Sequence, residues 1–181
     1  MTIAIVVGLS ALIVAIDQII KYFIYENLHP SGNVVVIDNL FSLVYSENRG
    51  AAFGIFQNAT LVFSIITIAL IAVFLYLLIS KKFTGKLFTT AVILIIGGGI
   101  GNLIDRIFRG FVIDYLSLSF FPPICNFADY CITIGAALFI LCILFTTGKD
   151  SKKGRHLPDA ETENEPAPAV NADEENTDGK D

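Results

Sequence analysis

Charged and amide side chains that are suited to chemistry gather in one stretch of this chain, residues 97–129, which lies between two long apolar segments. Such groups are costly beside membrane-length segments, so each is a candidate for function. Two carboxylates that share a partly desolvated site cannot both ionise easily, and such a pair is able to deprotonate a water and protonate a peptide carbonyl. The charged and amide side chains of residues 97–129 are Asn102, Asp105, Arg106, Arg109, Asp114, Asn126 and Asp129.

Asp114 and Asp129 are the two acids that we expect to pair. Pro122 and Pro123 lie between them and prevent one continuous helix, so the chain is able to turn back and bring the two carboxylates together. No Cys-His or Ser-His-Asp arrangement competes with this pair. A Ser-Lys pair is improbable, because the link that holds the nearby serines contains no lysine.

Each polar group also has a purely structural interpretation. Asp17 and Lys21 stand at i, i+4 and would neutralise each other within a helical bundle. Asn126 followed by Asp129 is typical of a helix N-cap with an acid in the first turn. The 3–4 spacing within 102–109 also fits a buried network with arginines that reach toward water.

Asp114 sits between apolar residues and has no basic neighbour in the chain, so its structural interpretation is an exposed loop acid.

The composition indicates a membrane protein. Of the 181 residues, 54% are hydrophobic and 16% are charged, whereas soluble domains carry about 25% charged residues. Most of the acid behind the net charge of -5 lies in the last part of the chain. The three cysteines follow no metal or disulfide spacing, and only two histidines are present, so a zinc site is not expected. Gly97–Gly99 with Gly101 lies in an apolar helix and is no nucleotide-binding loop.

Four apolar segments have membrane-spanning length, at about 3–24, 59–80, 87–107 and 128–146. We expect one transmembrane domain over residues 1–148, because the first segment has no basic start and no cleavage site of a secretory signal. Lysines in the 81–86 link and after the fourth segment place both termini in the cytoplasm by the positive-inside rule. The links 25–58 and 108–127 then face outward. The acidic, proline-containing residues 149–181 are expected to form a disordered cytoplasmic tail.

The outer links contain extended structure. The runs 34–37 and 41–45 are β-branched or aromatic and predict a hairpin, and Phe111–Leu118 is the candidate third strand. Asn48–Phe56 follows as a surface segment, and its two glycines motivate the hypothesis that it acts as a lid.

The polar groups of three spans share one depth. Asp17 and Lys21 lie in the outer half of the first span, 102–106 end the third, and 126–129 begin the fourth. A transport pathway would place polar groups near the midplane. The shared depth indicates a site just inside the outer face.

Four blocks of the chain resemble the bacterial lipoprotein signal peptidases, also called signal peptidase II. The blocks are Asp17-Gln18-Ile19-Ile20-Lys21, Asn48-Arg49-Gly50-Ala51-Ala52-Phe53-Gly54, Gly101-Asn102-Leu103-Ile104-Asp105-Arg106 continuing to Val112-Ile113-Asp114-Tyr115, and Asn126-Phe127-Ala128-Asp129. They occur in the family's order over about residues 10–145. The resemblance implies an all-α membrane protein of four transmembrane helices with a small extracytoplasmic β-sheet cradle and a surface helix.

The resemblance also implies a function. The family's members are aspartyl endopeptidases of the bacterial inner membrane that cleave prolipoproteins just before a diacylglyceryl-modified cysteine, without metal or cofactor. By matching position, Asp114 and Asp129 are expected to be catalytic. Substrate-contacting or site-supporting roles are expected for Asp17, Lys21, Asn48, Arg49, Asn102, Asp105, Arg106 and Asn126. We expect a monomer whose partners are this substrate and membrane lipid, with no nucleic acid.

Two alternatives from other classes stay open at this point. A small four-helix proton-coupled exporter would use an acid in its first span, which Asp17 fits loosely. A noncatalytic membrane assembly factor would use the 25–58 link as a docking surface.

Overall fold

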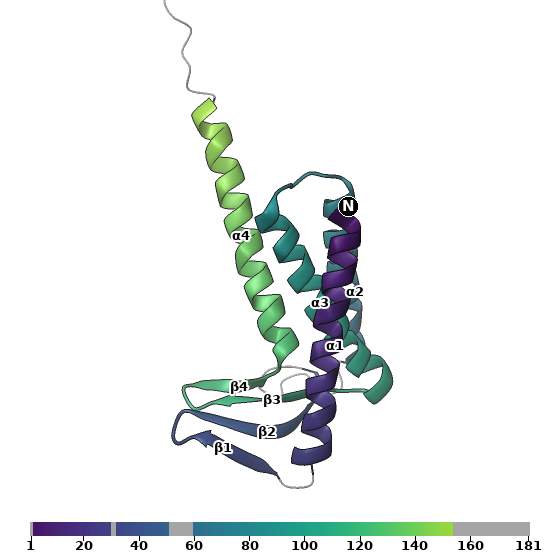
Figure 1. Cartoon of the computed structure of the whole chain (residues 1–181), viewed down its shortest axis with the longest axis vertical. Coiled ribbons are helices and arrows are strands. Elements are labelled where there is room, and N and C mark those ends of the chain that lie inside the picture. Colours follow the sequence, from purple (N-terminus) through teal and green to yellow (C-terminus); the bar gives the residue numbers. More distant parts are fainter. Residues whose placement is uncertain (1, 30–31, 51–59, 154–181) are drawn as a thin grey trace, which may run out of the picture.

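The fold is a bundle of four long helices with a small sheet across one end (Figure 1). This computed structural model describes residues 2–29, 32–50 and 60–153, and the side chains of 3–29, 32–50 and 60–146. The helices are α1 (Thr2–Leu28), α2 (Thr60–Ile79), α3 (Lys86–Arg109) and α4 (Phe127–Lys153). Each is long and apolar enough to cross a membrane, so the four predicted spans coincide with four helices.

Helix α4 runs past residue 149, where the tail was predicted to begin. Residues 154–181 lie outside the described part of the chain, so the disordered tail stays a prediction.

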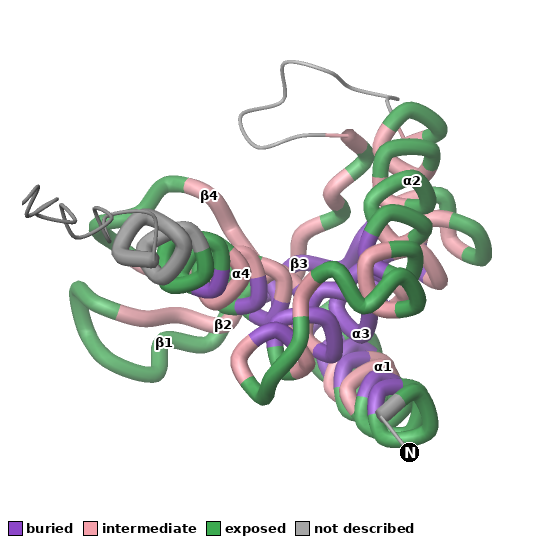
Figure 2. Tube along the Cα trace, turned by 90° about the horizontal axis from the view of Figure 1, so that it is seen from above, coloured by how far each residue is buried: buried purple, intermediate pink, exposed green. Residues whose placement is uncertain are grey.

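Helix α3 is the centre of the bundle. It packs against α1, α2 and α4, and Figure 2 shows the buried residues concentrated along it. Glycine makes the close approach possible: a Cβ atom on Gly98 would lie 2.5 Å from the carbonyl oxygen of Ala128 in α4. A Cβ atom on Gly101 would lie 2.6 Å from Oδ2 of Asp17 in α1. The glycine run is thus part of a packed helix, as the sequence predicted. It allows α1 and α4 to approach α3 closely where Asp17 and Ala128 lie.

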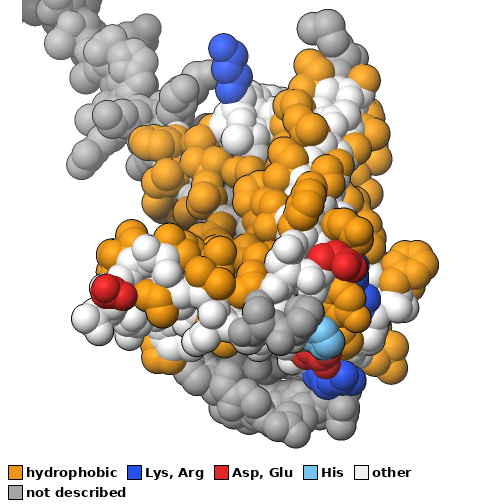
Figure 3. All heavy atoms as spheres, turned by 60° about the horizontal axis from the view of Figure 1, so that its bottom comes forward, with side chains coloured by type: hydrophobic (Ala, Val, Ile, Leu, Met, Phe, Trp, Pro, Cys, Tyr) orange, Lys and Arg blue, Asp and Glu red, His pale blue; other side chains and the backbone are white. Residues whose placement is uncertain are grey.

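The outer surface of the bundle is apolar and its interior holds the polar groups. Large hydrophobic side chains are open on every helix, including Val7, Leu61, Ile107 and Leu144, each more than 60% exposed. Hydrophobic atoms also cover much of the face in Figure 3. This distribution suits lipid around the helices, because buried ionisable groups in membrane proteins face the bundle interior.

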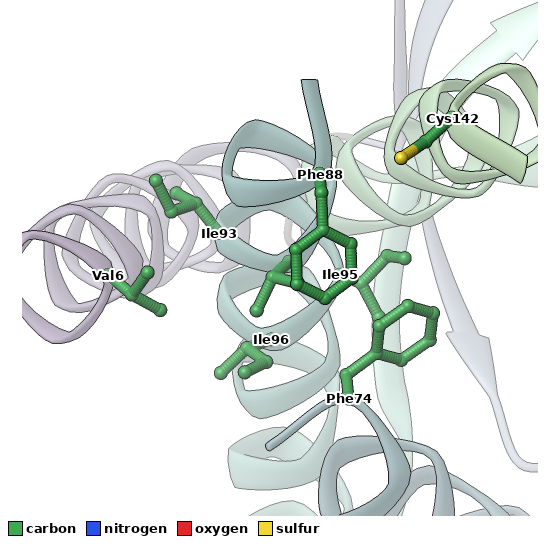
Figure 4. Packing of buried hydrophobic residues seen from close by; sticks show 8 residues of the cluster. Val6, Phe74, Phe88, Ile93, Ile95, Ile96 and Cys142 are labelled. Carbon is green, nitrogen blue, oxygen red and sulfur yellow. The ribbon is translucent and has the colours of Figure 1, made fainter. Parts of the chain in front are cut away.

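Two apolar clusters enclose the polar interior. The cluster far from the sheet joins all four helices (Figure 4); its members are Val6, Phe74, Phe88, Val92, Ile93, Ile95, Ile96 and Cys142. The cluster under the sheet joins the end of α1 to the third strand, through Ile24, Leu28, Ile113 and Tyr115. The groups between these clusters are held on rigid elements from both sides.

The sheet is an antiparallel meander of β1 (Asn33–Ile37), β2 (Phe41–Asn48), β3 (Val112–Leu118) and β4 (Phe121–Cys125). The predicted hairpin and third strand are confirmed, since β1 pairs with β2 and β2 with β3. Strand β4 was not predicted, because its two prolines suggested only a turn. An edge strand tolerates proline, whose missing N–H does not have to pair, and β4 is an edge of this sheet.

The predicted surface segment Asn48–Phe56 is described only as far as Gly50. Residues 51–59 lie outside the described residues, so the surface helix and the lid hypothesis stay predictions.

Candidate active site

The polar residues of α1, α3, α4 and the sheet meet in one layer at the sheet end of the bundle. This convergence is what the shared depth along three spans predicted. The side chains of six of them are buried to 3% exposure or less: Asp17, Lys21, Asn102, Asp105, Asp114 and Asn126. Most of the charge and hydrogen-bonding capacity of the layer is therefore directed inward, toward other members of the layer.

Lys21 is the hub of the half of this layer that faces α1. Its Nζ atom lies 2.9 Å from Oδ2 of Asp17 and 2.9 Å from Oδ2 of Asp105. The structural interpretation of Asp17 and Lys21 as a neutralising i, i+4 pair is confirmed, and Asp105 of α3 adds a second carboxylate. Asp105 also accepts the backbone N–H of Ile113 at 3.2 Å. This bond connects the ion-paired triad of Asp17, Lys21 and Asp105 to the start of β3.

Gln18 belongs to the same network, although its residue type and spacing predicted no role for it. Its Nε2 atom lies within 3.4 Å of Oδ2 of Asp17, of the carbonyl oxygen of Gly101 and of Oδ1 of Asp105. The signal available in the sequence was its place inside the block that begins at Asp17. The other oxygen of Asp17, Oδ1, is buried without a hydrogen-bond partner among the described residues.

Two asparagines connect this triad to the candidate acids. Asn102 donates from Nδ2 to Oδ1 of Asp129 at 2.8 Å, and its own Oδ1 accepts from Lys21 at 2.8 Å. Asn126 donates from Nδ2 to Oδ1 of Asp114 at 2.6 Å and to Oδ1 of Asn102 at 3.1 Å. The two carboxylates are thus held on either side of a shared pair of carboxamides.

The start of α4 fixes Asp129. The backbone N–H of Asp129 donates to Oδ1 of Asn126 at 3.0 Å, and the backbone N–H of Asn126 donates to Oδ2 of Asp129 at 3.1 Å. This reciprocal pair is a capping box, so the predicted N-cap is confirmed. Asp129 is half-buried, whereas its cap is fully buried. Asp129 therefore caps the start of α4 and also contacts Asn102 in the polar layer.

Asp114 lies on β3 and is 2% exposed, so its interpretation as an exposed loop acid is wrong. Asn48 at the end of β2 donates to its Oδ2 at 2.8 Å, which complements the bond from Asn126 to its Oδ1. Burial, followed by the negative charge of Asp129, raises the pKa of Asp114 from 3.8 to about 7. The two hydrogen bonds oppose this rise without cancelling it.

The three arginines of the matching blocks lie around the layer and differ in their contacts. The guanidinium of Arg106 is half-buried and lies over the ring of Phe63 in α2, 5.9 Å from its centroid. Arg109 approaches Oδ1 of Asp105 at 3.5 Å. Arg49 is exposed and pairs with Glu47 at 2.7 Å, so the structure does not bring it to either candidate acid.

Two further residues bear on the chemistry of the site. The hydroxyl of Tyr115, next to Asp114, accepts the backbone N–H of Phe127 at 3.2 Å and so anchors the first turn of α4 to β3. Cys125 precedes Asn126, and burial, with smaller effects from the charges of Asp129 and Asp114, raises the pKa of its thiol. A thiol that keeps its proton is a poor nucleophile.

The fold and the layer define a multi-pass membrane protein with a cluster of mostly buried polar and charged side chains at one end of its helices. A family model described as signal peptidase (SPase) II matches residues 9–145. The chain belongs to the signal peptidase II family.

Individual relatives agree. The chain is 42% identical over 138 residues to a lipoprotein signal peptidase from Caldanaerobacter subterraneus subsp. tengcongensis, covering 76% of this chain and 94% of the relative. It is 39% identical over 142 residues to one from Lactobacillus johnsonii, covering 78% and 92%. A bacterial membrane enzyme solved by the in meso method at 2.3 Å resolution has a TM-score of 0.74 at 29% identity, covering 86% of this chain and 94% of that one. The exporter and assembly-factor alternatives are set aside by this membership.

Proposed function

We propose that this protein is an aspartyl endopeptidase that removes signal peptides from diacylglyceryl-modified prolipoproteins, cleaving on the N-terminal side of the lipidated cysteine. The observation that carries the proposal is the bridge from Asp114 through Asn126 to Asp129. It holds two carboxylates from different elements beside each other in a desolvated layer. The names of the relatives support lipoprotein signal peptides as the substrate.

The two aspartates divide the acid and base roles according to their surroundings. Asp114 is the more deeply buried and is next to a second negative charge, which raise its pKa to about 7, so it is still partly protonated at neutral pH. Asp129 receives a hydrogen bond on each oxygen, from Asn102 and from the backbone of Asn126, which hold its carboxylate in place as an acceptor. Asp114 is therefore the acid and Asp129 the base.

The reaction follows from this division. Asp129 takes a proton from a water, and the water oxygen bonds to the carbonyl carbon of the scissile peptide while Asp114 gives its proton to the carbonyl oxygen. The resulting gem-diol collapses: Asp129 passes its proton to the departing nitrogen, the C–N bond breaks, and a diol hydroxyl returns a proton to Asp114. The products are the carboxylic acid of the signal peptide, which then ionises in water, and the free amine of the lipidated cysteine.

The position of the site fits a lipid-anchored substrate. A diacylglyceryl group fixes the scissile bond near a membrane surface, and the polar layer lies at the end of the bundle rather than at its middle. Lysines at the opposite end of the helices support cytoplasmic termini and a site that faces outward. Anchoring both reactants at one depth supplies part of the orientation that the reaction requires.

The test is a gel-shift assay with a diacylglyceryl-modified precursor in detergent micelles. Wild type is expected to convert the precursor, and Asp114→Asn and Asp129→Asn are each expected to lower turnover by at least about 1,000-fold. Asp38→Asn, an exposed acid in the turn between β1 and β2, serves as the matched control and is expected to keep full turnover. Near-normal conversion by either site variant, in a folded and membrane-inserted protein, would refute the two-aspartate mechanism.

A further inference from the structure

The ammonium of Lys21 has no hydrogen left for a substrate. Its side chain is 0% exposed, and Nζ has acceptors at 2.9 Å on Asp17, 2.9 Å on Asp105 and 2.8 Å on Asn102. An ammonium carries three donors and no acceptor, so these contacts use its capacity completely. Of the two roles that the family resemblance implied for Lys21, contact with substrate does not fit this geometry.

The contact with Asn102 has a directional consequence. A carboxamide has an acceptor end and a donor end, and the acceptor end of Asn102 receives both Lys21 and Nδ2 of Asn126. Its donor end therefore faces Asp129. If the group were turned around, its NH₂ would face two donors and its carbonyl oxygen would face the Asp129 carboxylate. All three new contacts would be repulsive.

We propose that Lys21 is a positioning residue: it fixes the orientation of the Asn102 carboxamide and thereby the hydrogen bond that Asn102 donates to Asp129. The inference rests on the proposed function and assigns a specific task to a group that does not touch the reacting atoms. The ammonium of Lys21 only donates hydrogen bonds, so it pairs only with the oxygen end of the Asn102 carboxamide. An apolar side chain in place of Lys21 removes this preference. Asp129 then loses one of the two donors that hold it ready as the base.

The competing explanation is that Lys21 only balances buried charge. Lys21→Met alone would remove the cation paired with Asp17 and leave Asp105 with Arg109 at 3.5 Å, and that variant is expected to fold poorly. The comparison therefore uses Asp17→Asn as the starting protein and adds Lys21→Met to it. Methionine keeps the length of the side chain, and Asp105 keeps its contacts with Arg109 and the backbone of Ile113.

The experiment is a double-mutant cycle. Asp17→Asn and Asp17→Asn/Lys21→Met are each measured with Asn102 intact and in an Asn102→Leu background, with kcat and KM for a diacylglyceryl-modified precursor. Enzyme concentration is corrected to the folded fraction, and the unfolding temperature is recorded for every variant. With Asn102 intact, adding Lys21→Met is expected to lower kcat by about 10- to 100-fold and leave KM within about twofold, as for the loss of one hydrogen bond to a charged group.

In the Asn102→Leu background, the same addition is expected to change kcat by less than about threefold, because the route from Lys21 to Asp129 is already absent. An equal loss in both backgrounds would overturn the proposal, since Lys21 would then act through charge or folding. A rise in KM in place of the fall in kcat would overturn it in favour of substrate contact.

Failure of the proposed function looks different. Wild type would then leave the diacylglyceryl-modified precursor uncleaved, or turnover would survive Asp114→Asn or Asp129→Asn. The cycle is interpreted in a protein that cleaves the precursor and depends on both aspartates, so its outcome bears on Lys21 alone.

Discussion

Asp114→Asn is expected to change how the stability of the protein depends on pH. In the unfolded chain the carboxyl ionises near 3.8, whereas in the folded protein burial and the charge of Asp129 raise its pKa to about 7. Between these two values the folded state binds the extra proton, so the free energy of unfolding falls as pH rises through this window. The rise in pKa corresponds to a total loss of about 4 kcal/mol in the free energy of unfolding once Asp114 is fully ionised. About 3 kcal/mol of this loss falls between pH 5 and pH 8.5.

The measurement is thermal unfolding in detergent at pH 5 and pH 8.5. For a chain of this length, about 3 kcal/mol corresponds to a fall of roughly 6 to 12 °C in the wild type. Asp114→Asn cannot ionise and is expected to remove most of that fall, although its unfolding temperature at pH 5 is lowered because one carboxamide N–H of a neighbour loses its acceptor. The exposed Asp38→Asn variant is the control and keeps the wild-type difference. Equal falls in wild type and Asp114→Asn would refute the account of the buried acid.

Three further outcomes follow from the packing around the site. Gly98→Ala forces a methyl group against the first turn of α4 and is expected to lower turnover at least about 10-fold in the precursor assay, whereas Gly99→Ala, whose Cβ atom would have its nearest neighbour at 3.4 Å, keeps most of it. Tyr115→Phe removes the acceptor of the Phe127 N–H and is expected to lower the free energy of unfolding by about 1 kcal/mol in denaturant titrations. Cys125→Ser is expected to retain turnover, and iodoacetamide-insensitive cleavage by this variant and by wild type is the check.

Hydropathy made the spans predictable because each helix is apolar over a membrane-spanning length, including α3, which is mostly buried inside the bundle. The polar layer was predictable for a related reason. Charged residues in apolar membrane segments face the interior of the bundle, where polar partners are available. Asp17, Asp105 and Asp129 lie near one depth, so they were expected to meet in one polar layer. The capping box at Asn126 was predictable because both of its residues lie within one turn.

Other features depend on pairing across the chain and left no local signal. Spacing along α1 showed that Lys21 reaches Asp17, but nothing near it in sequence showed that Asp105 and Asn102 of α3 take its two other hydrogens. Strand β4 was missed because proline argues against strands in general, and only its place at the sheet edge makes it admissible. The burial of Asp114 likewise results from β2, α1 and α3 packing against β3, which no pattern around residue 114 encodes.

The structural and functional interpretations of Asp129 describe one arrangement. The acid of a capping box accepts a backbone N–H at the helix start, and this contact immobilises its carboxylate. Under the proposed function, the catalytic base needs such a fixed position. What the cap alone does not provide is the second acid, which arrives from β3 through Asn126, the residue that is itself the cap. The helix start therefore helps to set the spacing of the two carboxylates, and under the proposed function a change in the cap would also change the chemistry.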